Sequence, residues 1–231
     1  MKFDALEPAR LIQRLNRFAA AIQWRGGEAR AHVPNSGRMA ELLVPGAELM
    51  VAPAPEGRAT ACTLELVRYG DQWVCVHAVR ANRLAQEALE QGLIEPGASE
   101  IRREVAMGGS RVDLAYRMGG QACFLEVKSV TLIRSGWACF PDAPTTRGVK
   151  HLRELAAQVA QGNRAGVLFV IGRQEAQAFE PNYATDPDFA RALCWARAQG
   201  VWVAAHKSRV SPEGMDLCQA VPLHLEAGDF R

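Results

Sequence analysis

The chain has 231 residues, 48% of them hydrophobic, and a formal net charge of only +2. This composition indicates a globular protein with one large core or two modest ones, and it excludes disordered chains and repeat arrays. No apolar run approaches the roughly 20 residues of a membrane span, and the first residues lack the apolar centre of a signal peptide, so we expect a cytoplasmic protein that does not enter a membrane.

The first 80 residues are predicted to form short strands separated by turns rich in glycine and proline. The strands are expected at 18–24, 28–33, 48–52, 62–68 and 73–79. The first two form a hairpin across Gly26 and Gly27, and the last two form a second hairpin. Segment 11–18 suits either a helix or a strand. Several short strands without a clear helix predict an all-β, OB-like barrel over residues 1–80.

Positive charge is concentrated near the N-terminus, although the whole chain is almost neutral. Residues 1–40 contain seven basic and three acidic side chains. A basic face of this kind supplies contacts to phosphate groups, and Arg14, Arg17 and Arg38 are the candidates for binding nucleic acid. The alternative, which charge alone leaves open, is a surface solvated mainly by arginine.

From residue 81 onward the apolar spacing changes to that of helices alternating with strands. Helices are predicted at 82–91, 147–160 and 187–199, and strands at 104–107, 111–116, 122–130, 166–171 and 201–205. This order predicts an antiparallel hairpin that feeds strands joined by helical crossovers. Residues 81–231 are therefore expected to form an α/β domain with a mixed sheet flanked by helices.

Cysteine and histidine spacing does not indicate a zinc site. The six cysteines never form a CxxC pair, and the five histidines are far apart in the sequence. Buried free thiols are the simpler expectation.

Two carboxylates and a lysine are predicted to share one face of the hairpin formed by 111–116 and 122–130. With Gly119 and Gly120 as the turn residues, Asp113 pairs directly with Glu126, and their Cβ atoms lie about 4.5 to 5.5 Å apart. Lys128 is two residues from Glu126 and therefore lies on the same face. Because like charges this close repel each other, we expect a cation between the carboxylates.

This arrangement is typical of the metal site of PD-(D/E)XK nucleases. Asp113, Glu126 and the Val127 carbonyl would bind Mg²⁺ (or Mn²⁺), while Lys128 would orient the attacking water or stabilise charge on the phosphate. Glu87, on the preceding helix, is a further candidate ligand, or else a solvated side chain. The alternative for the whole set is a solvent-facing row in which Lys128 pairs with a carboxylate, and a register shift of one residue would remove the pairing.

The start of the helix at 147–160 carries a second group of candidates. Arg147, Lys150 and His151 follow a loop that contains two prolines. Backbone N–H groups and positive side chains at the N-terminus of a helix can hold a phosphate. Solvation of the surface by these residues is the alternative.

Several separate segments resemble the sugar fermentation stimulation protein A family. They are HVPNSGRM at 32–39, ANRL at 81–84, SRVD at 110–113, EVKSVTL at 126–132, FPDA at 140–143, TRG at 146–148, KHLREL at 150–155 and SPEGM at 211–215. The resemblance implies an N-terminal OB-like domain, a nuclease-like domain of the PD-(D/E)XK kind, DNA binding and a link to sugar utilisation. It marks the PNSG segment as a family signature, so Asn35 is included among the candidates for nucleic-acid contact, although these four residues also favour a plain turn.

The favoured function is that of a DNA-binding protein with a magnesium-dependent site that hydrolyses phosphodiester bonds. DNA is favoured over RNA as the partner, and Phe18 and Trp24 are candidates for stacking on bases of a single strand. The alternative is a non-catalytic DNA-binding regulator of sugar-utilisation genes. The sequence leaves the oligomeric state open, a homodimer included.

Overall fold

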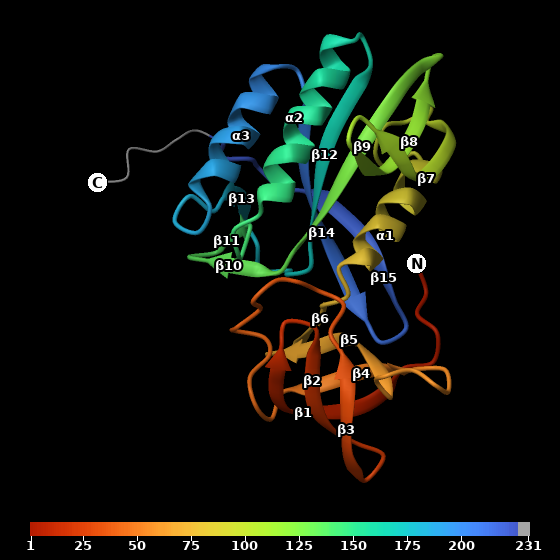
Figure 1. Ribbon diagram of the computed structural model, residues 1–231, viewed down its shortest axis with the longest axis vertical. Helices are drawn as coiled ribbons and strands as arrows, with labels where there is room; N and C mark the ends of the chain where they lie inside the picture. Colours follow the sequence, from red (N-terminus) through yellow and green to blue (C-terminus); the bar gives the residue numbers. More distant parts are fainter. Residues whose placement is uncertain (226–231) are drawn as a thin grey trace.

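The computed structural model describes residues 1–225, which form a β-barrel and a helix-flanked sheet that lie against each other (Figure 1). The last part of the predicted second domain, 226–231, lies outside the described residues.

The barrel is built from the strands β1 Glu7–Asn16, β2 Ala19–Trp24, β3 Gly27–His32, β4 Glu48–Pro53, β5 Cys62–Tyr69 and β6 Gln72–Cys75. Their order is β3-β2-β1-β4-β5-β6, and a parallel pairing of β3 with β5 closes the first five strands on themselves. In an open sheet of this size the edge strands would be unpaired, whereas closure gives them a partner. The predicted OB-like barrel is confirmed.

In the barrel, one alternative left open by the sequence is decided, and one local detail differs from the sequence-based expectation. Segment 11–18, which suited a helix or a strand, lies mostly in β1, where Leu11 is buried against the barrel interior. The first hairpin turns at Arg25 and Gly26, whose φ angles are 52° and 81°, and Trp24 pairs with Gly27. The turn is therefore one residue earlier than predicted, because a two-residue hairpin turn of this type needs positive φ at both central positions.

The helix α1, Val79–Glu90, joins the barrel to the second domain. Strand β6 ends at Cys75, so the predicted strand over 73–79 was too long at its C-terminal end. Leu66 and Cys75 of the barrel share a hydrophobic core with Leu84 of α1. The buried carboxylate of Glu65 on β5 also accepts hydrogen bonds from Arg80 on α1, at 2.7 and 2.9 Å. Apolar packing and a buried ion pair thus fix the barrel to the helix.

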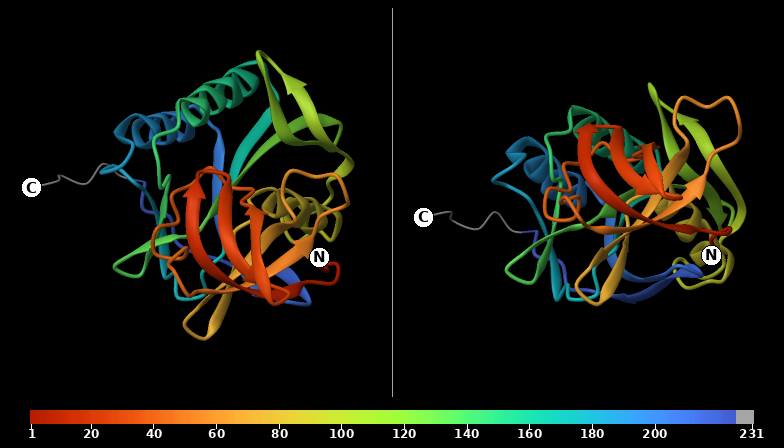
Figure 2. Two further views of the ribbon diagram at one scale, coloured as in Figure 1. Left: turned by 60° about the horizontal axis from the view of Figure 1, so that its bottom comes forward. Right: turned by 90° about the horizontal axis from the view of Figure 1, so that it is seen from below.

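The second domain is a mixed six-stranded sheet between two layers of helix. Its strands are β7 Ser99–Met107, β8 Ser110–Met118, β9 Gln121–Val130, β12 Arg164–Ile171, β14 Trp202–Ser211 and β15 Gly214–Ala220, in the order β15-β14-β12-β9-β8-β7. The strands β9, β12 and β14 are parallel, and the outer pairs are antiparallel. Helix α1 packs on one face, while α2, Thr146–Ala160, and α3, Pro187–Ala198, pack side by side on the other (Figures 1 and 2). The predicted mixed sheet flanked by helices is confirmed, and the three helices lie within about three residues of their predicted bounds.

Three short strands that the sequence analysis did not predict form a small separate sheet. They are β10 Leu132–Arg134, β11 Trp137–Phe140 and β13 Ala178–Pro181. Strands of three or four residues are too short to show an alternating pattern. Strand β15 was also missed. The small sheet matters for the site, because β11 leads directly into the loop that begins α2 (Figure 1).

All six cysteines are free, and four of them are buried, as expected; Cys194 and Cys218 are partly exposed. Within residues 1–225, no group of three or more histidine, cysteine or acidic side chains is arranged to hold a metal ion. In the same described part of the chain, no helix is long and apolar enough to cross a membrane.

Candidate metal and nucleic-acid site

The β8–β9 hairpin has the predicted register. Leu114 pairs with Leu125 and Met118 with Gln121, as the glycine turn required. The regular ladder ends at Leu114 and Leu125, one step before Asp113 and Glu126, where β9 continues alongside β12. Because the strands separate at this point, Asp113 reaches the backbone N–H of Val127, which donates to its Oδ2 at 2.7 Å.

Asp113 is a carboxylate held in an unfavourable environment. Its other oxygen accepts a hydrogen bond from Asn82 Nδ2 on α1 at 2.6 Å. Burial and, next, the negative charge of Glu126 raise the pKa of Asp113 from its usual 3.8 to about 6, against the opposing effects of the Val127 N–H and Lys128. A carboxylate whose charge is disfavoured in this way is a typical feature of a binding site for a cation.

Glu126 is almost completely buried, with an exposed fraction of 3%. Its Oε1 accepts hydrogen bonds from Lys128 Nζ at 2.6 Å and from His151 Nδ1 at 2.5 Å. Burial by itself raises the pKa of Glu126, but these hydrogen bonds and the charge of Lys128 outweigh it, so the pKa is lowered overall. The other oxygen, Oε2, is buried and has no hydrogen-bond partner among the described residues. An unpaired buried carboxylate oxygen costs free energy unless a further group binds it.

His151 and Arg147, on the first turns of α2, fix the orientation of Glu126. His151 Nε2 accepts a hydrogen bond from Arg147 Nε at 3.3 Å, so the ring proton is on Nδ1 and is donated to Glu126. In metal sites, a side chain that hydrogen-bonds to a ligand residue and fixes its orientation is a positioning residue, and His151 has this role toward Glu126. Sequence reasoning had placed His151 as a contact to nucleic acid, but its side chain is 2% exposed and points inward.

The donor atoms fit a hard divalent cation that keeps water or substrate as additional ligands. Asp113 and the unpaired Glu126 Oε2 supply carboxylate oxygens, and Val127 lines the same cavity. Mg²⁺ is usually bound through one or two carboxylates while several positions remain for water and phosphate. Two carboxylates are too few for a metal site whose ligands all come from the protein, but they suffice for a Mg²⁺ site completed by water and phosphate.

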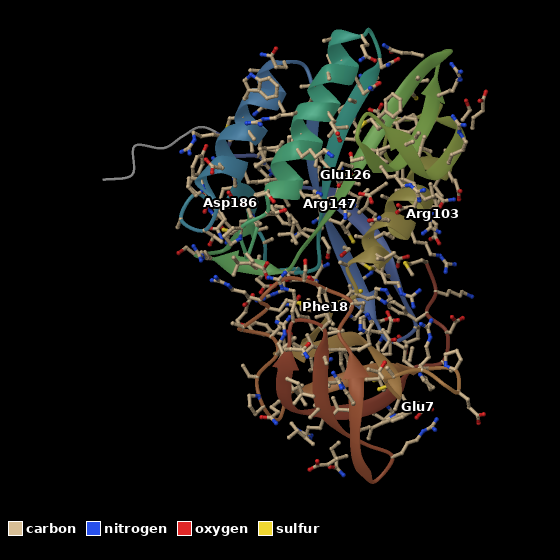
Figure 3. The ribbon with its side chains drawn as sticks, in the orientation of Figure 1. Glu7, Phe18, Arg103, Glu126, Arg147 and Asp186 are labelled. Atoms are coloured by element: carbon tan, nitrogen blue, oxygen red, sulfur yellow. The ribbon has the colours of Figure 1, made fainter. Side chains whose placement is uncertain are left out.

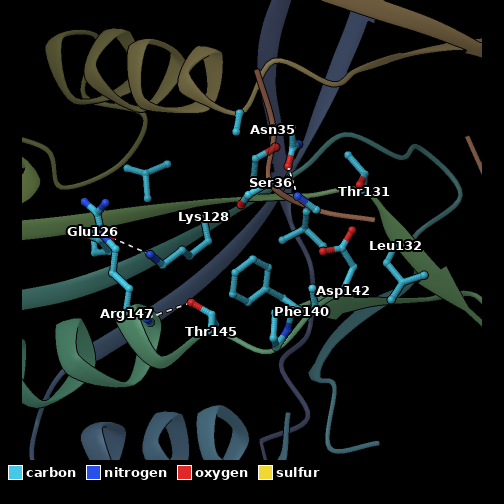
Figure 4. A pocket seen from close by; sticks show the side chains of 18 of the residues that line it. Asn35, Ser36, Glu126, Lys128, Thr131, Leu132, Phe140, Asp142, Thr145 and Arg147 are labelled. Carbon is cyan, nitrogen blue, oxygen red and sulfur yellow. Dashed lines mark hydrogen bonds and ion pairs between the residues drawn. The ribbon is translucent and has the colours of Figure 1, made fainter. Parts of the chain in front are cut away.

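The two carboxylates line a cavity of about 480 Å³ whose walls come from both domains. In Figure 4, Lys128 extends from β9 toward Glu126, with Ser36 of the barrel on one wall and Thr145 on another. A volume of this size is typical of a pocket for a small molecule or for one unit of a polymer.

The barrel side of this cavity is held in place by contacts between two distant loops. Asn35 Oδ1 accepts from the Gly37 N–H at 2.8 Å, and its Nδ2 donates to the Val76 carbonyl at 3.1 Å. Asp142, from the loop before α2, accepts from the Met39 N–H at 3.1 Å. A Cβ at position 37 would lie 2.5 Å from Asp142 Oδ2, so a larger residue there would displace the carboxylate that accepts from the Met39 N–H. The two loops form one wall.

Two family sequence models match this chain, and a family of relatives follows from them. The sequence model described as "Sugar fermentation stimulation protein RE domain" matches residues 79–214, and the one described as "SfsA N-terminal OB domain" matches residues 12–76. The chain belongs to the sugar fermentation stimulation protein family. A homolog of this name from Desulforamulus reducens is 42% identical over 216 residues, which cover 93% of this chain and 90% of that protein. One from Acetivibrio thermocellus is 42% identical over 227 residues, covering 96% and 97%.

A solved structure of the same family has the same fold over nearly the whole chain. The structure of Pyrococcus furiosus SfsA in complex with Ca²⁺ superposes with a TM-score of 0.88 and 27% sequence identity. The superposition covers 97% of this chain and 98% of that one. The arrangement of barrel and sheet described above is therefore a property of the family, and the predicted family resemblance is confirmed.

The structure places the remaining predicted site residues differently. Glu87 does not reach the cavity: it forms an ion pair with the N-terminal amine of Met1 at 2.8 Å and lies 3.4 Å from Arg83. In this arrangement Glu87 lies outside the candidate metal site, since α1 turns that side chain toward the N-terminus. The residue of α1 that does reach Asp113 is Asn82.

The predicted nucleic-acid contacts divide into three groups. Arg17 and Arg147 line the cavity. Arg14 uses its guanidinium internally, donating to the backbone carbonyls of Gly37, Arg38, Asn16 and Arg17. Arg38 and Lys150 are exposed outside the cavity. Asn35 also lines the cavity, and its side chain, like that of Arg14, forms hydrogen bonds that shape the loops.

Two residues of the site were not singled out from the sequence. Asn82 is a polar residue on the stripe of α1 that also carries Ala85 and Leu89, and a polar side chain among buried ones was the signal that could have revealed it. Asp142 gave no such signal, because a proline-rich loop commonly contains aspartate.

Proposed function

We propose that this family member binds DNA and hydrolyses its phosphodiester bonds with a divalent cation, Mg²⁺ or Mn²⁺, at Asp113 and Glu126. The observation that carries the proposal is a pair of carboxylates in a cavity that also contains a lysine: Asp113 is partly buried and has a raised pKa, and Glu126 is buried and has an unpaired oxygen. The Ca²⁺ in the Pyrococcus furiosus relative supports a divalent-cation site in the family.

Each residue has a defined role in this proposal. Asp113 and Glu126 bind the cation, and when bound it polarises the phosphodiester and lowers the pKa of a water molecule. Lys128, whose ammonium group lies at the cavity, attracts the phosphate and stabilises the negative charge that develops on it. His151 holds Glu126 in one orientation, and Asn82 does the same for Asp113.

The test is cleavage of labelled single-stranded DNA, duplex DNA and RNA in Mg²⁺ and Mn²⁺. Asp113→Asn, Glu126→Gln and Lys128→Ala should each reduce the rate by about 100-fold or more, as loss of a group that stabilises the transition state does. Glu87→Gln is the matched control, since it removes a carboxylate on α1 that does not reach the cavity.

Equal cleavage by all variants would show a contaminating nuclease and refute the catalytic assignment. Binding without cleavage in any metal would instead support the alternative, a non-catalytic DNA-binding regulator. In that case Asp113→Asn and Glu126→Gln should tighten DNA binding, because each removes a negative charge that repels phosphate.

A further inference from the structure

A second, larger concavity adjoins the site. It lies between α2 and α3, has a volume of about 950 Å³, and is lined by Lys150, Arg153 and Trp195 among others; we call it the α2–α3 groove. Residues 144–146 line both this groove and the site cavity, so the two share a wall at the N-terminus of α2. Nothing in the proposed hydrolysis at Asp113 and Glu126 uses this groove.

Basic side chains lead from the cavity into the groove. Arg147 lines the cavity, and Lys150 and Arg153 line the groove, so three cations follow one another at three-residue spacing along one side of α2. The N-terminal backbone N–H groups of this 15-residue helix lie at the shared wall. Arg153 has no carboxylate partner within residues 1–225, and Lys150 donates only to the Gly109 carbonyl at 2.8 Å and lies 3.7 Å from Glu154. A row of cations of this kind matches the repeating charge of a phosphate backbone.

The opposite side of the groove presents an exposed aromatic ring. Trp195 on α3 has an exposed fraction of 47%, although its helix buries Phe189, Leu193 and Ala196 against the core. An exposed tryptophan beside a row of cations is the combination by which proteins bind single strands, with bases stacked on the ring and phosphates on the charges. Asp186, at the start of α3, is already used by the N–H groups of Thr145 and Phe189, and Asp188 is paired with Arg191, so these carboxylates are compensated within the protein. Figure 3 shows Arg147 and Asp186 at the ends of α2 and α3 nearest the barrel.

We propose that the substrate strand is single-stranded and continues from the site cavity over the N-terminus of α2 into the α2–α3 groove, where Trp195 stacks on a base and Lys150 and Arg153 contact phosphates. This inference rests on the proposed function. A single strand is favoured over a duplex because Glu126 is only 3% exposed and lines a cavity that is walled by both domains. A phosphate on the surface of an intact double helix cannot enter such a cavity unless its strand leaves the helix.

The test measures binding of the full chain to fluorescein-labelled oligothymidylates of about 2 and about 15 nucleotides, and to a duplex of the longer length, in CaCl₂. Trp195→Ala should weaken binding of the long single strand by about 10-fold and leave the short one, which fills only the site cavity, unchanged. Trp195→Phe keeps a stacking ring and should stay within about 3-fold of the wild type. It should also reduce the quenching of intrinsic fluorescence by the long strand, because it removes the tryptophan on which we place a base.

Salt dependence gives an independent reading of the phosphate contacts. For the long single strand, Arg153→Ala should reduce the slope of log K against log salt by about 0.7, the value for one phosphate contact. Arg209→Ala is the matched control, because that arginine is 73% exposed on β14, outside both concavities, and should leave the slope unchanged.

The outcomes separate this inference from the proposed function. If the wild type binds the long strand but Trp195→Ala and Arg153→Ala bind it equally well, the groove is not part of the binding site, and the proposed function stands. If Trp195→Ala weakens the duplex as much as the single strand, the assignment to single strands is wrong. If the wild type binds none of the oligonucleotides, both proposals fail.

Discussion

Replacing Asp113 with asparagine should stabilise the metal-free protein while removing its metal site. The raised pKa means that the folded protein holds the Asp113 proton more tightly than the unfolded chain does. The contribution of Asp113 to stability is therefore most favourable below pH 3.8 and is lost as the pH rises through about 6. At neutral pH the ionised carboxylate costs the fold up to about 3 kcal/mol, and Asp113→Asn removes this cost.

The hydrogen bonds of Asp113 allow this substitution. An asparagine oxygen can accept from the Val127 N–H, and the Asn82 amide can rotate so that its oxygen accepts from the new side chain. The gain should fall from about 3 kcal/mol near neutral pH to about 2 kcal/mol at about pH 5 and to less than about 1 kcal/mol at about pH 4, as the wild-type carboxyl becomes protonated.

The assay is urea unfolding in EDTA at these three pH values, repeated with MgCl₂ near neutral pH. Wild type should gain about 2.7 kcal/mol at a Mg²⁺ concentration 100 times its Kd, whereas Asp113→Asn should gain almost nothing. Asp216→Asn, at an exposed position on β15, is the control and should change stability by less than about 0.5 kcal/mol. A gain for Asp113→Asn that is the same at all three pH values, or a loss of stability near neutral pH, would refute the reasoning.

Three further substitutions test the interdomain wall and the barrel. Gly37→Ala should lower stability by about 1 to 3 kcal/mol in thermal unfolding, because the new Cβ meets the Asp142 carboxylate. Gly27→Ala is the control and should be nearly neutral, since there is open space around its Cβ. Equal effects of the two substitutions would contradict this account of the wall. Glu65→Gln should lower the free energy of unfolding in urea by about 3 kcal/mol, because it leaves the partly buried guanidinium of Arg80 on α1 without its carboxylate. A change below about 1 kcal/mol would show that this ion pair does not hold the barrel to the helix. Phe18 is half exposed at the end of the barrel nearest the second domain (Figure 3). Phe18→Ala should therefore weaken binding of a single strand by about 10-fold with little loss of stability. An unchanged affinity, measured by fluorescence anisotropy, would exclude base stacking at this position.

The sequence by itself determined the elements whose signals are local. The spacing of apolar residues located the three helices, and two glycines at 119 and 120 set the register that brings Asp113 close to Glu126. The i, i+2 spacing placed Lys128 beside Glu126, because alternation along a strand is fixed by backbone geometry. The family resemblance rests on short sequence segments such as HVPNSGRM and EVKSVTL, and the family comparison confirms it.

Only the tertiary structure decided which distant residues complete the site. Asn82, Asp142 and His151 reach it from three separate parts of the chain, and no local pattern shows which side chains a packed interface will turn inward. Glu87 and Arg14 had suitable chemistry, but the rotation of α1 and the fold of the loop at 35–38 direct them to other partners. The chemical groups of the side chains can be read from a sequence, whereas the direction of each side chain depends on how elements far apart in the chain pack together.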